Sequence, residues 1–134
     1  MDLSMAIIKS DILMAKQGID LFKDKGINEI KNQTAYHLQQ ATEKLIKIQV
    51  YSSGVEYNNK YMFVHNIDSL SAYADSLSID VDIPIEVRDN AVTISDWEAS
   101  GRYDLHFSVR IDTLEKYYSI ILDWYDRLYK RGIR

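Results

Sequence analysis

Residues 28–53 read NEIKNQTAYHLQQATEKLIKIQVYSS and carry the longest run of helical periodicity in the chain. Residues spaced by three or four share one face of this stretch, and its small or apolar members are Ala35, Leu38, Thr42, Leu45 and Ile48, with Ala41 beside them. Gly54 follows at once, and glycine ends helices because it adopts the left-handed conformation without a steric cost. The pattern predicts an amphipathic α-helix from about Asn28 to Ser53.

A second helical pattern precedes this one, from about Ser4 to Lys25. Its apolar face consists of residues at alternating spacings of four and three: Ile8, Ile12, Ala15, Ile19 and Phe22. Gly26 supplies the stop. Each helix is predicted to exceed about 30 Å, and only two residues separate them, so they must form an antiparallel hairpin.

The sequence pattern in the middle of the chain predicts two further helices, separated by irregular segments. Residues 55–64 lack helical periodicity and are interpreted as a loop. A third helix is predicted over 66–78 and a fourth over 84–99, with Pro84 in its first turn. Residues 79–83 alternate like a strand but have no partner strand. The residues predicted to face inward are Ile67, Leu70, Ala74, Leu77, Val87, Ala91, Ile94 and Trp97.

The last third of the chain predicts a fifth helix. Residues 102–110 are interpreted as a connector, and Asp112-Thr113-Leu114-Glu115 as an acidic variant of the capping box that starts a helix ending near Gly132. Its inner face consists of Leu114, Tyr117, Ile121, Trp124 and Leu128, with Tyr118, Tyr125 and Tyr129 beside them. The sequence therefore predicts an all-α fold, an antiparallel bundle of about five helices, in a single domain over residues 1–134.

The composition narrows the classes of function. The chain has no cysteine, which excludes disulfides and thiolate metal sites. Its three histidines are scattered, without zinc-site or calcium-loop spacing, so no metal is predicted. No phosphate-binding glycine loop, dinucleotide fingerprint or nucleophile elbow is present, so no cofactor is predicted. Without a signal-peptide or membrane-span pattern, we expect a cytoplasmic protein that does not enter a membrane.

The charge distribution limits the kinds of nucleic acid that the chain is expected to bind. The net charge is −4, and residues 75–104 hold eight acidic residues against Arg88 and Arg102. Such a stretch repels phosphate, so we expect no duplex DNA binding and only local contact with single-stranded RNA. Basic residues gather only at the C-terminal end, where they complement a helix dipole: Arg127, Lys130, Arg131 and Arg134.

Residues 35–47, AYHLQQATEKLIK, resemble the central signature of HEPN domains. Residues 65–70, HNIDSL, resemble the histidine and leucine at the start of the family's third helix, and Trp97 with Arg102-Tyr103 resembles the tryptophan and Arg-Tyr pair near the end of the fourth. The resemblance spans about residues 4–128. It implies a helical bundle, often a homodimer, that associates with nucleotides or RNA and in many members pairs with a minimal nucleotidyltransferase as toxin and antitoxin.

Some HEPN proteins are metal-independent ribonucleases, and the resemblance points to residues for that chemistry. Those enzymes have an arginine, four to six residues, then a histidine that acts in acid/base chemistry. Here Arg102 and His106 have three residues between them, and Lys60 and His65 have the right interval but begin with lysine, which lacks the bidentate guanidinium. The ribonuclease motif is therefore not intact, and whether the chain is an enzyme stays open.

The candidate catalytic residues are Arg102 and His106, which lie in the predicted connector. In the alternative interpretation, Arg102 pairs with Asp96 or Asp104, and His106 is a surface residue.

Four other residues are candidates for ligand or partner binding: His65, Glu43, Lys47 and Tyr103. His65 either contacts phosphate at a helix N-terminus or fixes the start of the third helix through a hydrogen bond. Glu43 and Lys47 are spaced for a helix ion pair. The aromatic residues of the fifth helix suit core or dimer packing, and alternatively base stacking.

Three functions follow from these patterns. The first is a non-catalytic HEPN-like binding module, homodimeric, with a protein partner such as a nucleotidyltransferase and with nucleotide or RNA as further ligands. The second is a divergent ribonuclease that uses Arg102 and His106. The third is a purely structural subunit.

Overall fold

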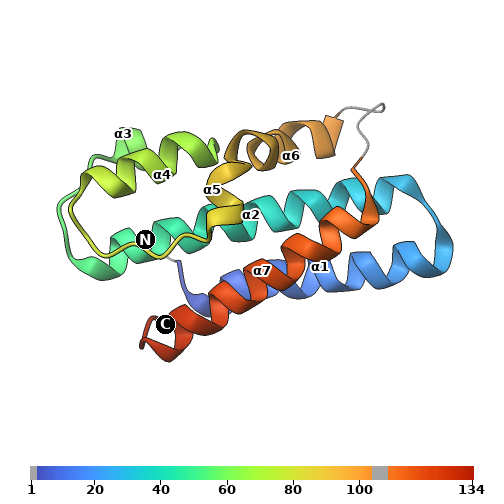
Figure 1. The fold of residues 1–134 in the computed structure, drawn as a ribbon, viewed down its shortest axis with the longest axis horizontal. Coiled ribbons are helices and arrows are strands. Elements are labelled where there is room, and N and C mark those ends of the chain that lie inside the picture. The colour runs from blue at the N-terminus through green and yellow to red at the C-terminus, as the bar shows by residue number, and fades with distance from the viewer. Residues whose placement is uncertain (1–2, 104–108) are drawn as a thin grey trace.

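The computed structural model describes residues 3–103 and 109–134, and every regular element in these ranges is a helix (Figure 1). The helices are α1 (Met5–Lys25), α2 (Asn28–Ser53), α3 (Asn59–Met62), α4 (Ile67–Ser76), α5 (Ile85–Asp89), α6 (Ala91–Tyr103) and α7 (Ile111–Lys130). The all-α prediction is confirmed, with more helices than predicted because the short α3 was missed and the predicted fourth helix is divided in two.

The α1–α2 hairpin follows the sequence pattern closely. Ser4 caps α1 by accepting a hydrogen bond from the Ile7 amide, and Gly26 ends it with a φ of 68°. The helices approach closely where Gly18 faces Thr34, since a Cβ at position 18 would collide with Thr34 Oγ1. Glycine at this position therefore sets the distance between α1 and α2.

Helix α2 lies at the centre of the bundle. It packs against α1 and α7 on one side and against α4 and α6 on the other, and α1 runs antiparallel to both α2 and α7 (Figure 1). The second half of α2 is buried nearly all round. The predicted inner faces of α1, α2, α4, α6 and α7 meet in one core, in which Trp97 and Trp124 are the largest side chains.

Two predictions for the middle of the chain need correction. Residues 59–62 form α3 inside the predicted loop, because Asn58 Oδ1 accepts from the Lys60 amide and Met62 is fully buried. The predicted fourth helix is divided at Asn90 into α5 and α6, and Pro84 is the N-cap residue of α5, one position before its first turn.

The prediction for the segment after α6 is partly wrong. Helix α6 continues to Tyr103, so Arg102 and Tyr103 belong to its last turn and not to a connector. Helix α7 begins at Ile111 with Arg110 as its N-cap, and the predicted capping box is absent: Asp112 instead forms an ion pair with Arg110. The ion pair competes for the carboxylate that the capping box requires.

Residues 79–83 form no strand. The backbone of Asp82 is held by Gln49, whose amide both donates to its carbonyl and accepts from its amide, and by Trp124 Nε1. Arg127 binds the Asp82 carboxylate with two hydrogen bonds. The segment is therefore fixed by side chains of α2 and α7, which satisfy its backbone in place of a partner strand.

Candidate functional site

Glu43, on the central helix α2, has a buried carboxylate with three partners. Lys47 Nζ donates to Oε2 at 2.9 Å, and Gln39 Nε2 donates to Oε1 at 3.3 Å. His65 Nδ1 lies 2.9 Å from Oε1, and an ionised carboxylate only accepts, so the ring N–H donates. Glu43 is 4% and Lys47 7% exposed. Gln39, Glu43, Lys47 and His65 are called the Glu43 network below.

The Glu43 network ties α2 to the start of α4. Gln39 Nε2 also donates to the backbone carbonyl of His65 at 3.0 Å, and His65 directly precedes Asn66, the N-cap of α4. The His65 ring is 62% exposed on its outer side. The structure thus brings three predicted site residues together, Glu43, Lys47 and His65, and adds Gln39, which the sequence analysis did not single out.

The geometry of the network indicates what it can do chemically. Both carboxylate oxygens of Glu43 already accept hydrogen bonds, and the ammonium of Lys47 balances its charge. The three contacts link Glu43 to two residues of its own helix and to the residue before α4, which is an arrangement that suits a structural role.

The segment of residues 55–64, called the aromatic segment below, directly precedes His65 of the network. Its exposed aromatic side chains are Tyr57, Tyr61 and Phe63. The backbone amide of Asn58 donates to Tyr73 Oη at 2.6 Å, and the rings of Tyr61 and Tyr73 lie 5.2 Å apart. With Met62 in the core and His65 tied to Glu43, this segment presents aromatic groups on a fixed support.

A second polar cluster joins α1 to α2. Asp11 Oδ1 lies 3.0 Å from His37 Nδ1, and Lys44 Nζ donates to Oδ2 at 2.6 Å. Burial alone would raise the pKa of Asp11, but hydrogen bonds from His37 and Lys44 and their positive charge outweigh it, so this pKa is lowered. These three residues are called the Asp11 cluster.

The sequence analysis missed the Asp11 cluster. A signal was present, since Asp11 directly precedes the buried Ile12, and a charged residue beside an apolar face needs a partner. His37 and Lys44 lie seven residues apart and so on one side of α2.

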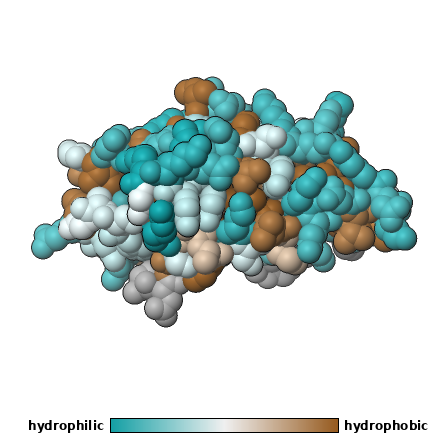
Figure 2. All heavy atoms as spheres, turned by 90° about the horizontal axis from the view of Figure 1, so that it is seen from below, coloured by the Kyte–Doolittle hydropathy of each residue, from teal (hydrophilic) through white to brown (hydrophobic). Residues whose placement is uncertain are grey.

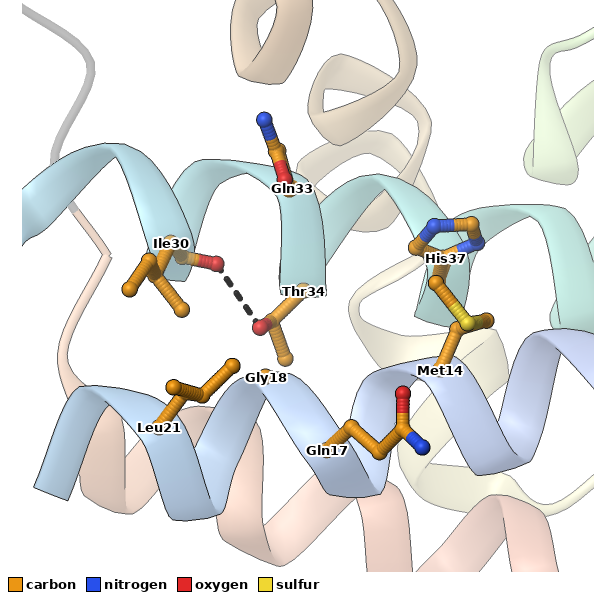
Figure 3. A pocket seen from close by; sticks show the side chains of 8 residues that line it. All are labelled: Met14, Gln17, Gly18, Leu21, Ile30, Gln33, Thr34 and His37. Carbon is orange, nitrogen blue, oxygen red and sulfur yellow. Dashed lines mark hydrogen bonds between the residues drawn. The ribbon is translucent and has the colours of Figure 1, made fainter. Parts of the chain in front are cut away.

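A small cavity lies beside the Asp11 cluster, in the groove between α1 and α2 (Figure 3). Its volume is 110 Å³, and its walls include Met14 and Leu21 from α1 and Thr34 and His37 from α2. Ligand pockets for small molecules measure about 300–1,000 Å³. The cavity is therefore too small for a nucleotide and suits a single side chain.

Apolar side chains are exposed along the same helix. Those on α1 or the turn after it are Ile7, Leu13, Met14, Leu21 and Ile27. Figure 2 shows hydrophobic residues interrupting the hydrophilic covering on the side of the molecule seen from below. These side chains are exposed one by one along α1 and the turn after it.

The remaining predicted site residues are only partly described. Arg102 and Tyr103 lie on the last turn of α6, and their side chains are outside the described part of the chain, as is the whole of His106. Two of the C-terminal basic residues are paired with acids: Arg127 binds Asp82, and Arg131 Nη2 lies 3.7 Å from Asp80.

Within residues 3–103 and 109–134, no group of three or more histidine and acidic side chains is arranged to hold a metal ion. Over the same described residues, no helix has the length and hydropathy needed to cross a membrane.

The chain was compared with protein-family models, curated proteins and solved structures, and none of the three gave a match.

Proposed function

We propose that the chain is a HEPN-like binding module that acts as a homodimer and binds a protein partner through the aromatic segment, without catalysis of its own. The observation that carries the proposal is the Glu43 network. Its residues lie in the stretch that resembles the HEPN signature, and their hydrogen bonds are directed at one another and at the start of α4.

The chemistry of the aromatic segment favours a protein as its partner over RNA. Tyrosine and phenylalanine are enriched in protein interfaces and dominate their binding energy. Single-stranded RNA also stacks on aromatic rings, but it requires a positively charged groove. Residues 55–64 contain one base, Lys60, and one acid, Glu56, so the segment has no net charge. The whole chain has a net charge of −4, and its electrostatic attraction for phosphate is therefore weak.

The resemblance to HEPN domains suggests a minimal nucleotidyltransferase as the partner protein. A pull-down of a nucleotidyltransferase encoded beside this chain should succeed with the natural sequence and weaken at least about tenfold with Phe63→Ala or Tyr61→Ala. Val92→Ala is the matched control, because Val92 is as exposed as Phe63 but lies on α6. Equal weakening by all three variants would contradict binding through the aromatic segment.

A second experiment separates this proposal from the ribonuclease that would use Arg102 and His106. The purified protein and its His106→Ala variant are incubated with single-stranded and structured RNA. The binding module predicts no cleavage by either protein. Cleavage that disappears in His106→Ala would overturn the non-catalytic proposal.

A third measurement addresses the structural-subunit alternative. Light scattering gives the mass of the natively purified protein, and the ultraviolet absorbance ratio reports nucleotide or RNA carried through purification. A dimer mass is expected. A purely structural subunit predicts no retained nucleotide and no loss of partner binding in Phe63→Ala.

A further inference from the structure

His65 and Glu43 form a histidine–carboxylate pair in which the ring is exposed and the acid is buried. His65 Nδ1 donates to Glu43 Oε1 over 2.9 Å, and the histidine side chain is 62% exposed. The hydrogen bond fixes the neutral ring in one tautomer, with the proton on Nδ1 and a lone pair on Nε2. Because Nδ1 faces the buried acid, Nε2 is the ring nitrogen directed outward.

This pair prepares Nε2 to react with an electrophile. A carboxylate behind Nδ1 keeps the lone pair on Nε2 and stabilises the positive charge that the ring gains when Nε2 forms a bond. Histidine acts as a nucleophile in covalent catalysis through such a nitrogen. Lys47 and Gln39 hold the Glu43 carboxylate from its own helix, so the acid keeps its position behind the ring. The arrangement that ties α2 to α4 therefore also suits a nucleophile.

The start of α4 favours an anionic group beside the ring. His65 directly precedes Asn66, the N-cap residue of this ten-residue helix. The Asn66 side chain makes no capping hydrogen bond, and within the described residues the backbone amides of Asp68 and Ser69 have no acceptor. Unpaired amides and the helix dipole attract negative charge at a helix N-terminus. A phosphoryl group suits both features, since it bonds to nitrogen and carries negative charge.

We propose that His65 Nε2 is a phosphoryl acceptor that takes the group from a donor with a phosphorus–nitrogen bond. The Nε2 lone pair attacks phosphorus, and the bond from phosphorus to the donor nitrogen breaks. That nitrogen leaves with the bonding electron pair and takes up a proton from solvent. The Nδ1 proton stays between the ring and Glu43. One phosphorus–nitrogen bond replaces another, so the transfer is balanced without an oxidant or a reductant.

The negative charge of the chain does not exclude this site. A single phosphoryl group needs only a local contact, whereas RNA requires an extended basic groove. The opposing charge on α4 is Asp68, an exposed carboxylate in its first turn. Asp68→Asn should therefore speed phosphorylation of His65 by about twofold to fivefold, because it removes a like charge from the helix N-terminus.

Phosphoramidate is the probe, and mass spectrometry at neutral pH locates the modified histidine. We expect His65 to react at least about twice as fast as His37, in the ratio of their exposed side-chain fractions, 62% and 26%. His37 is the matched control, because its Nδ1 also lies 3.0 Å from a carboxylate oxygen. A rate at His65 no higher than at His37, or no phosphorylation of either ring, would refute the proposal.

Glu43→Gln tests whether the acid positions the ring. Glutamine can accept from Nδ1 or donate to it, so the tautomer is no longer fixed. The rate at His65 should fall at least about tenfold, and phosphorus NMR should show the group on both ring nitrogens instead of on Nε2 alone. Asp11→Asn makes the same charge change beside His37 and should leave His65 unaffected. An unchanged rate in Glu43→Gln, or equal slowing in both variants, would contradict the proposal.

Phosphorylation would also regulate the binding surface. It adds about two negative charges only two positions after Phe63, an exposed ring of the aromatic segment. This consequence rests on the proposed function, whereas the acceptor role does not. The pull-down with the nucleotidyltransferase should weaken after phosphorylation of the natural protein and stay unchanged after the same treatment of His65→Ala. Phosphorylation of His65 without any loss in the pull-down would uphold the acceptor and contradict binding through the aromatic segment.

Discussion

The Glu43 network and the Asp11 cluster are built from the same groups in different settings. Each has a carboxylate held by one lysine and one histidine, and each uses side chains of α2. In the Glu43 network the lysine is buried and the histidine mostly exposed, whereas in the Asp11 cluster the lysine and the histidine are both about a quarter exposed. The comparison teaches that the energetic importance of such a site depends on how deeply the charges are buried.

The largest effect is expected from breaking the Glu43 network. Glu43→Ala leaves the ammonium of Lys47 buried without its counter-charge, which should lower the free energy of unfolding by about 3–5 kcal/mol. Urea denaturation measures the loss. The double variant Glu43→Ala with Lys47→Met should recover part of it, because no unpaired charge then remains. A loss below about 1 kcal/mol for the single variant would contradict the buried ion pair.

A smaller effect is expected from the corresponding change in the Asp11 cluster. Asp11→Ala should lower the free energy of unfolding by about 1–2 kcal/mol, because Lys44 and His37 can turn toward water once the carboxylate is gone. The same denaturation experiment measures both variants. If Asp11→Ala costs as much as Glu43→Ala, burial does not distinguish the two sites.

The Asp11 cluster should also give a pH dependence with a defined sign. The pKa of Asp11 is lowered in the folded protein, so its ionised form stabilises the fold at pH values above the unfolded value of 3.8. This stabilisation is lost as the pH falls through the lowered folded pKa. The difference in unfolding free energy between the natural protein and Asp11→Asn should therefore shrink as the solution is acidified below 3.8. A difference that grows with acid would contradict the assignment.

The smallest effect is expected at the exposed histidine. His65→Ala should lower the free energy of unfolding by less than about 1 kcal/mol, because the ring is mostly in water and Gln39 still holds the His65 backbone. The matched variant His37→Ala should cost more, since that ring is less exposed. Thermal unfolding of both variants measures which one is less stable. A larger loss of stability in His65→Ala than in His37→Ala would contradict the claim that exposure sets the size of the effect.

Much of the fold could be predicted from the sequence where local pattern and packing agree. The bounds of α2 match the prediction, because its periodicity and Gly54 both mark them. The break at Asn90 and the end of α6 at Tyr103 could not be predicted, since no proline or glycine marks Asn90 and since Gly101 lies inside the helix instead of ending it. The missing capping box has a similar cause, because Arg110 competes for Asp112.

The candidate site could be predicted only in part. Glu43 and Lys47 are one turn apart on the same helix, so their pairing follows from helix geometry. The contacts of Glu43 with His65 and of Asp11 with Lys44 join residues that are distant in the sequence. Such contacts depend on how the helices pack, which a single-sequence pattern does not encode.

Hydrogen exchange in the aromatic segment tests most directly the claim that the Glu43 network orders the binding surface. The backbone amides of Tyr61, Met62 and Phe63 are hydrogen-bonded within the segment and report its opening. We predict that Glu43→Gln speeds their exchange at least about tenfold, while Asp11→Asn leaves them near the natural rate. Unchanged exchange in Glu43→Gln, or equal acceleration in both variants, would contradict the account.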